Sequence, residues 1–438
     1  MYRIRVVEEG ALGSLLNSIC IPVFFKEWHM KNAIYILILA LVFMAGCAKT
    51  GKEETKGIMF KDDVAFLRQN TQAVLLSDES GQAQVAVNPD LQGRVMTSTA
   101  GGPEGLSFGW INRELLASKQ NNVHMNAFGG EDRFWLGPEG GQFSIFFKKD
   151  DPFDLEHWFT PPPINEGAYD IAFQDRERIQ FKKAMRLVNY SGTEFDLELN
   201  REVKLLATDQ IQSLGISVPA RVKMVAYQSD NKITNTGQKE WTKETGRLSV
   251  WILGMFNPSP ETTIVIPFKP GPEADLGPAV NDAYFGKVPA DRLLIKDGVL
   301  FFSGDGKYRS KIGISPKRVK PFAGSYDAAN KVLTIVHLTI PEGATDYVNS
   351  MWEIQKNPFG GDVVNSYNDG PAAAGAKPLG PFYELETSSP AAALKPGETL
   401  AHVHTTLHFR GDEKTLDGIA RQALGVGIEE IKAAFQIR

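Results

Sequence analysis

Apolar and polar residues alternate over many short runs of this chain, which is the period-two pattern of strands with one buried face. The longest alternating runs are 178–189 and 194–206, and the turn at 190–192 between them predicts a large antiparallel hairpin. Further predicted strands cover 73–78, 83–88, 94–97, 106–112, 220–236, 247–255, 262–267, 291–296, 299–302, 311–314, 331–338, 351–356, 382–388 and 402–409.

Helical patterns are confined to the two ends of the predicted fold. A short helix is predicted over 60–67, and an amphipathic pair over 414–424 and 428–435, with Thr415 as its N-cap. No repeat of roughly 20 to 50 residues is visible, which disfavours propellers and solenoids. The pattern therefore predicts a mainly β protein, with one large antiparallel β-sandwich over 58–438 and a short C-terminal helical segment.

Composition and charge narrow the class further. With 42% hydrophobic, 10% aromatic and 23% charged residues, the chain can bury a full core, which excludes a disordered or collagen-like protein. Its 47 basic and 52 acidic side chains leave a net charge of −5, so no positive field gathers phosphate backbones. Nucleic acid is therefore not expected as a partner, and neutral ligands fit better.

The N-terminal residues contain the pattern of a targeting signal. Residues 30–46 combine a basic start, an apolar stretch and a small-residue end directly before Cys47, as in a secretory signal peptide. This arrangement resembles the lipobox of bacterial lipoproteins, in which the cysteine is acylated, with Met44 in place of the usual leucine. The apolar stretch is too short for the roughly 20 residues that span a bilayer. Residues 1–29 are interpreted as a mis-assigned N-terminal extension, and residues 47–57 as a polar tether. With a lipid on Cys47, we expect an outer-membrane lipoprotein of the cell envelope that faces the periplasm or the cell surface.

The densest chemical motif is 126–141, which mixes five glycines with acids, an arginine and a tryptophan. Glycines let the backbone approach a ligand, charged groups bond to hydroxyls, and an indole stacks on the apolar face of a sugar ring. The alternative is a turn-rich connector whose charges pair on the surface. Under the first interpretation, the segment and its neighbours supply these sugar-binding side chains: His124, Glu131, Asp132, Arg133, Trp135, Glu139 and Trp158.

Two glutamates in a later strand form a second candidate site. Glu384 and Glu386 are two residues apart and so share one strand face. Such a pair faces solvent, meets a cation, or has one pKa raised enough for acid–base chemistry. The apolar Leu385 on the opposite face indicates a half-buried strand, which favours a functional pair over a solvated one.

Three histidines form a third candidate. His402, His404 and His408 lie on one face of a predicted strand, and a His-x-His pair with a third ligand such as Glu386 can bind zinc or iron. Alternatively, the imidazoles bond to neighbouring side chains. Residues 395–398 partly match a cupin motif that lacks its downstream glutamate, so a metal-dependent cupin-like enzyme stays open as an alternative. No other cofactor is expected.

Three of these segments together resemble the galactose mutarotase-like (aldose 1-epimerase-like) superfamily, and in particular a bacterial lipoprotein branch of it. Residues 129–139 resemble the glycine-rich sugar-site segment of hexose epimerases, and 385–387 read Leu-Glu-Thr as in aldose 1-epimerases. Residues 394–398 and 402–409 resemble the Pro-Gly-Glu turn and the last long strand. The resemblance implies a β-supersandwich fold, and it implies that Glu386 is the base that takes the anomeric hydroxyl proton.

The chain departs from that family at the general acid. Mutarotases carry a histidine on the strand after an Asn-Thr-Gly-type turn, but here 235–237 is followed by a strand without histidine, and Trp251 takes that neighbourhood. The predicted function is a lipid-anchored carbohydrate-binding or carbohydrate-active protein that acts at the anomeric or adjacent carbon, with a non-catalytic glycan-binding lipoprotein as the alternative. The residues expected to act are Glu386, Glu384 and Arg133 in catalysis, and Trp251 and His404 in sugar binding beside those of the glycine-rich segment and its neighbours.

Overall fold

The computed structural model describes residues 57–373 and 375–435, which belong to one compact unit, Gly57–Arg438. The predictions for the extension 1–29, the signal peptide 30–46, the lipidated Cys47 and the tether up to residue 56 lie outside these described residues. Within the described part of the chain, no helix is long and apolar enough to cross a membrane.

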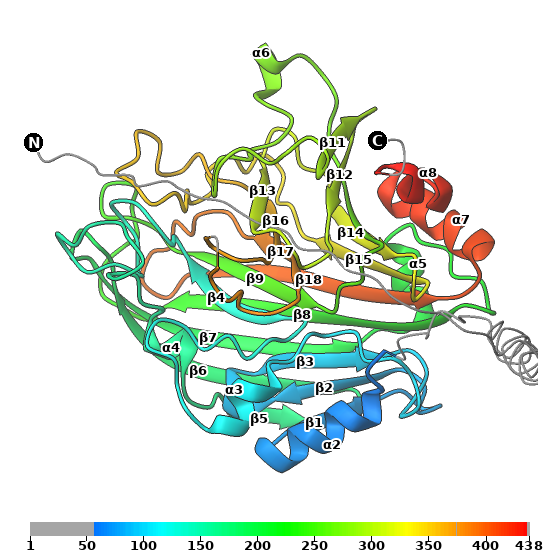
Figure 1. Cartoon of the computed structure of the whole chain (residues 1–438). Coiled ribbons are helices and arrows are strands. Elements are labelled where there is room, and N and C mark those ends of the chain that lie inside the picture. The colour runs from blue at the N-terminus through cyan, green and yellow to red at the C-terminus, as the bar shows by residue number, and fades with distance from the viewer. Residues whose placement is uncertain (1–56, 374, 436–438) are drawn as a thin grey trace, which may run out of the picture. The chain divides into compact units, whose positions relative to one another are not determined.

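Three sheets make up the described fold, and every pairing between their strands is antiparallel (Figure 1). The largest has ten strands in the order β11-β12-β10-β14-β15-β18-β8-β7-β6-β5, the second has five in the order β13-β16-β17-β9-β4, and the third is β1-β2-β3. The ten-stranded sheet consists of β5 (Asp170–Gln174), β6 (Arg178–Val188), β7 (Glu194–Leu205), β8 (Lys223–Asn235), β10 (Thr262–Pro267), β11 (Leu293–Lys296), β12 (Val299–Ser303), β14 (Phe322–Asp327), β15 (Val332–Leu338) and β18 (Thr399–Arg410). The other two consist of β4 (Arg133–Gly137), β9 (Ser249–Phe256), β13 (Ser310–Ile314), β16 (Val364–Asn368) and β17 (Tyr383–Ser388), and of β1 (Val74–Ser77), β2 (Gln84–Asn88) and β3 (Arg94–Thr99).

The five-stranded sheet packs its inner face against the ten-stranded sheet, and strand alternation decides which side chains enter this core. In β17, Leu385 and Tyr383 belong to a buried apolar cluster with residues of β10, β12, β14 and β15. Glu384 and Glu386 must then point from the outer face of the same strand. The two faces of the five-stranded sheet therefore have different chemistry.

Helices cover part of the fold. On the ten-stranded sheet, α7 (Glu413–Leu424) and α8 (Ile428–Ala433) pack their apolar sides on the face away from the five-stranded sheet, where Leu424 joins Leu333 and Leu407 in a buried cluster. Asp412 is the N-cap of α7, and its carboxylate accepts the Thr415 backbone N–H at 3.0 Å, so the prediction of Thr415 as N-cap is wrong. The remaining helices are α2 (Phe60–Asn70), η1 (Pro89–Leu91), α3 (Arg113–Ser118), α4 (Pro162–Asn165), α5 (Thr208–Ser213) and α6 (Glu273–Leu276).

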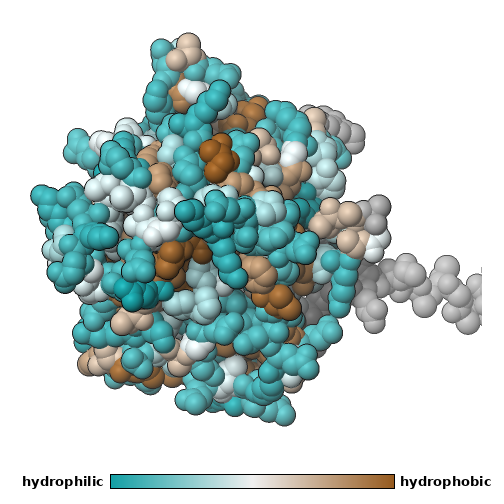
Figure 2. All heavy atoms as spheres, turned by 90° about the vertical axis from the view of Figure 1, so that its left-hand side faces the viewer, coloured by the Kyte–Doolittle hydropathy of each residue, from teal (hydrophilic) through white to brown (hydrophobic). Residues whose placement is uncertain are grey.

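The predicted fold class is confirmed: the protein is mainly β and antiparallel, with a short C-terminal helical segment. The strands predicted at 106–112 and 351–356 are wrong, because the first makes only isolated bridges and the second contains no strand residues. The sequence patterns missed β4, β5, β14 and β16. On the side of the molecule shown in Figure 2, hydrophobic residues form only small separate patches among hydrophilic ones.

Candidate functional site

A pocket of about 440 Å³ lies on the outer face of the five-stranded sheet. Alternate residues of the strands form its floor, and loops that include Trp158 and Trp352 form its walls. The floor side chains are Arg133 and Trp135 of β4, Trp251, Leu253 and Met255 of β9, Lys311 of β13, Tyr367 of β16 and Glu384 of β17.

Two buried contacts, each between a basic side chain and a carboxyl group, hold the floor together. Arg133 Nη2 donates to Glu384 Oε1 at 3.2 Å, and Lys311 Nζ donates to Glu386 Oε2 at 2.9 Å. The Trp251 indole Nε1–H donates to the same Glu386 oxygen, also at 2.9 Å. Because two donors on different strands hold one oxygen, the Glu386 carboxylate has a fixed orientation, while its other oxygen, Oε1, is buried and accepts no hydrogen bond from the described residues.

The ionisable groups at the floor have shifted pKa values. Burial raises the pKa of Glu384 to about 8, opposed by the charge of Arg133 and reinforced by the charge of Glu386. Burial disfavours the charge of Lys311, but Glu386 and Glu139 outweigh it and raise the pKa of the ammonium group. Near pH 7 the Glu384 carboxyl is therefore largely protonated, and Arg133 then donates its hydrogen bond to a neutral acid.

Tryptophans line one side of the pocket. Trp135 meets Trp251 edge to face with ring centroids 5.6 Å apart, and Trp158 stacks on Trp352 at 6.0 Å. The Arg133 guanidinium lies 4.2 Å from the centre of the Trp135 ring. The indole Nε1 of Trp158 is buried and has no partner among the described residues, so this wall offers both apolar ring area and a free donor.

His124 and Glu139 complete the predicted residues that reach the pocket. The Nδ1 atom of His124 lies 2.7 Å from the carbonyl oxygen of Trp158. Since a carbonyl only accepts, Nδ1 carries the hydrogen and Nε2 is left as an acceptor. Burial raises the pKa of Glu139, and the positive charge of Lys311 opposes this shift. Glu139 is thus a second carboxyl group of the pocket with a raised pKa.

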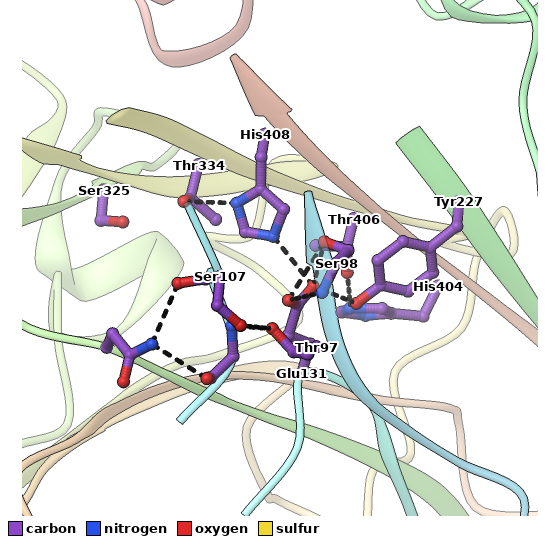
Figure 3. A network of polar contacts seen from close by, with 12 residues as sticks. Thr97, Ser98, Ser107, Glu131, Tyr227, Ser325, Thr334, His404, Thr406 and His408 are labelled. Atoms are coloured by element: carbon purple, nitrogen blue, oxygen red, sulfur yellow. Dashed lines mark hydrogen bonds and ion pairs between the residues drawn. The ribbon is translucent and has the colours of Figure 1, made fainter. Parts of the chain in front are cut away.

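Glu386, Glu131, Asp132 and His404 are fully buried and do not line this pocket, which corrects the prediction that they lie among its lining residues. The side chains of Glu131 and Asp132 are fully buried between the sheets, where Glu131 accepts hydrogen bonds from the Ser98 backbone N–H, from Tyr227 and from His408 (Figure 3). Asp132 pairs with Arg201 of β7 at 2.7 Å. For Asp132 the physical reason is alternation, because it directly precedes Arg133 and its side chain leaves the backbone on the opposite side. Glu131 lies before β4 and next to Gly130, whose φ of 109° breaks the extended backbone, so alternation does not apply to it.

The strand histidines lie behind the pocket floor. Thr387 follows Glu386 and so points inward, where its hydroxyl lies 2.9 Å from a ring nitrogen of His402 and 2.9 Å from one of His404. Burial lowers the pKa of His402 to about 3 and that of His404 to about 4, so both rings are neutral. His408 bonds to Thr334 and to Glu131 instead.

These contacts do not support the metal site considered for the three histidines. In the part of the chain that the structure describes, no group of three or more His, Cys, Asp or Glu side chains is placed to hold a metal ion. The physical reason is that threonine hydroxyls and Glu131 occupy the ring nitrogens, and that β17 separates the histidines from Glu386.

Several pocket residues were missed by sequence reasoning. Lys311, Arg309, Tyr367, Asp369 and Trp352 all line the pocket. The only signal for Lys311 was a lysine within an apolar strand run, which is costly to bury without a partner. The partner, Glu386, lies 75 residues away in the sequence and is brought near by the strand order of the sheet.

The chain also contains the spacing of a serine-hydrolase motif, Gly-Leu-Ser-Phe-Gly, at 105–109. Ser107 is buried, and its hydroxyl bonds to Asp63 and to Thr97. The segment is not a strand-to-helix turn and does not line the pocket, so Ser107 serves the packing of α2 against β3.

Comparison with known proteins assigns the chain to a family. The site belongs to a mainly β, antiparallel sandwich protein whose pocket is lined by aromatic side chains and by charged side chains of both signs. The chain itself belongs to the family described as "Family of unknown function (DUF6786)", whose model matches residues 58–435. No curated protein matches the chain.

Solved structures similar to the chain include galactose mutarotase-like proteins, the group predicted from the sequence resemblance. The Slr1438 protein from Synechocystis sp. PCC 6803 is 13% identical with a TM-score of 0.47, covering 78% of this chain and 96% of that chain. A galactose mutarotase-like protein from Lactobacillus casei ATCC 334 is 9% identical with a TM-score of 0.44, covering 77% and 100%. A galactose mutarotase related enzyme from Lactobacillus acidophilus is 10% identical with a TM-score of 0.42, covering 78% and 98%.

Proposed function

We propose that the pocket binds a sugar and exchanges its anomers by acid–base catalysis. The observation that carries this proposal is the carboxyl pair of β17: Glu384 lines the pocket and holds a proton near neutral pH, and Glu386, buried beside it, is oriented by the floor residues Trp251 and Lys311. The tryptophan wall beside the pair suits the apolar face of a sugar ring, and the free Trp158 N–H suits a hydroxyl. The Leu-Glu-Thr resemblance at 385–387 supports the same use of Glu386.

The pair can perform both proton transfers of ring opening. Glu386 accepts the proton of the anomeric hydroxyl, while Glu384 donates its proton to the ring oxygen as the bond between C1 and that oxygen breaks. The product is an open-chain aldehyde with its former ring oxygen as a hydroxyl. Rotation about the C1–C2 bond and the reverse transfers then close the ring to the other anomer. Glu384 thus fills the role of the general-acid histidine that this chain lacks.

Saccharide binding and turnover test this proposal separately. Calorimetry across neutral and acidic monosaccharides and short oligosaccharides should find ligands, and NMR exchange spectroscopy should show faster interconversion of the anomers of a bound monosaccharide than in buffer. Binding without exchange would favour the non-catalytic glycan-binding alternative, in which Arg133 and Lys311 only hold the two carboxyl groups in place. Absence of any saccharide binding would contradict both.

We also propose that the protein is anchored to the outer membrane through Cys47, on the sequence pattern of 30–47 alone. Metabolic labelling with a radioactive fatty acid should label the native chain and should not label Cys47→Ser. Cys20→Ser is the matched control and should keep the label. Equal labelling of the Cys47→Ser variant and the native chain would overturn the anchor.

A further inference from the structure

One cation at the pocket differs from the others. Arg133 bonds to the carboxyl group of Glu384, and Lys311 bonds to that of Glu386. Arg309 also lines the pocket and is half-buried, but its guanidinium forms no ion pair or hydrogen bond with the described residues. An arginine has five N–H donors in a rigid fork, so this side chain offers unused donors to whatever enters the pocket.

The position of Arg309 is held without using those donors. Its guanidinium stacks 3.7 Å from the centre of the Phe285 ring, and Phe285 also lines the pocket, with 43% of its surface exposed. Stacking on Phe285 fixes the plane of the guanidinium group and leaves the N–H donors at its edges free to bind a ligand.

Asp369, which also lines the pocket, forms no ion pair with Arg309. Asp369 attracts the guanidinium, but one of its carboxylate oxygens accepts the Tyr367 hydroxyl at 2.7 Å and the other accepts the Gly380 backbone N–H at 2.9 Å. Arg309 and Lys311 are two residues apart on one face, which corresponds to about 7 Å along a strand. The unused donors therefore lie beside the floor groups, within reach of the same bound sugar.

We propose that Arg309 recognises an oxyanion carried by the sugar, so that the ligand class is an acidic saccharide. This inference rests on the proposed function and adds the substituent that the pocket selects. A carboxylate or a phosphate matches the fork through two charge-assisted hydrogen bonds, whereas a hydroxymethyl group matches it poorly. The carboxylate of a uronic acid and a sugar phosphate share this chemistry, and the test separates them.

Calorimetry with matched pairs tests the inference: D-glucuronate against D-glucose, D-galacturonate against D-galactose, and glucose 6-phosphate against glucose. We expect at least one acidic sugar to bind about tenfold to a hundredfold more tightly than its neutral counterpart. Arg309→Gln should remove that preference and leave the affinity for the neutral sugar within about threefold. The preferred acid identifies the substituent as a carboxylate or a phosphate.

An exposed arginine outside the pocket provides the control. Arg221→Gln removes the same charge from a side chain that is 65% exposed, and it should keep the preference. Neutral sugars that bind as tightly as acidic ones, or an Arg309→Gln variant that loses both equally, would overturn the inference and leave the proposed function standing. A protein that binds no saccharide would overturn both.

Discussion

Replacing Glu386 by glutamine should slow anomer exchange by about a hundredfold to ten-thousandfold, because the variant loses the base that accepts the anomeric hydroxyl proton. Glutamine keeps the size of the side chain and an oxygen for the Trp251 indole N–H, so the binding of a saccharide should change far less than the exchange rate. NMR exchange spectroscopy gives the rate, and calorimetry on the same sample gives the affinity.

The native protein should also show a pH dependence that Glu384 explains. Its pKa is raised to about 8, so the protonated acid is present at neutral pH and is lost as the pH rises through that value. The exchange rate should therefore fall above about pH 8, by up to tenfold for each further pH unit.

Glu342→Gln is the matched control for both measurements, because Glu342 is exposed and does not line the pocket. It should leave the rate and its pH profile unchanged. An exchange rate in Glu386→Gln equal to that of Glu342→Gln would show that Glu386 is not the base.

The two faces of a strand could be predicted where apolar and polar residues alternate in the sequence. Glu384 and Glu386 share a face as expected, with Leu385 on the other, because β17 lies between a core and a pocket and so needs two different faces. The strand predicted at 262–267 has the same first and last residues as β10. Its apolar residues end at Pro267, which cannot donate a backbone hydrogen bond.

The local grouping of residues 126–141 misled the site prediction. Arg133, Trp135 and Glu139 reach the pocket, whereas Glu131 and Asp132 enter the core between the sheets. The sequence did not reveal that a strand begins at Arg133, because β4 reads Arg-Phe-Trp-Leu-Gly and is buried on both faces.

Partners from distant strands could not be predicted at all. Lys311 faces Glu386 because β16 lies between β13 and β17, and β16 was not recognised as a strand. The same strand order brings Arg309 and Asp369 to one pocket, since Asp369 directly follows β16. Such pairs follow from sheet topology, which short-range periodicity does not encode.

The ion pair between Asp132 and Arg201 should be among the most important polar contacts for stability. Both side chains are fully buried, their charged atoms lie 2.7 Å apart, and Arg201 also donates to the Gly93 carbonyl oxygen. Arg201→Met leaves the Asp132 carboxylate without its cation in the core, which should lower the free energy of unfolding by about 3 to 5 kcal/mol. Urea unfolding followed by tryptophan fluorescence measures this loss.

Two further variants distinguish a structural pair from a sugar-binding acid. Arg186→Met removes an exposed cation that pairs with Glu194 and Asp196, and it should cost less than about 1 kcal/mol. Asp132→Asn combined with Arg201→Met removes both buried charges and should be more stable than Arg201→Met alone, because no unpaired charge remains. Asp132 lies behind the pocket floor, so the double variant should bind saccharides with native affinity where it is folded. A cost for Arg201→Met no larger than that for Arg186→Met would contradict the structural role, and a loss of saccharide affinity in the folded double variant would return Asp132 to the sugar site.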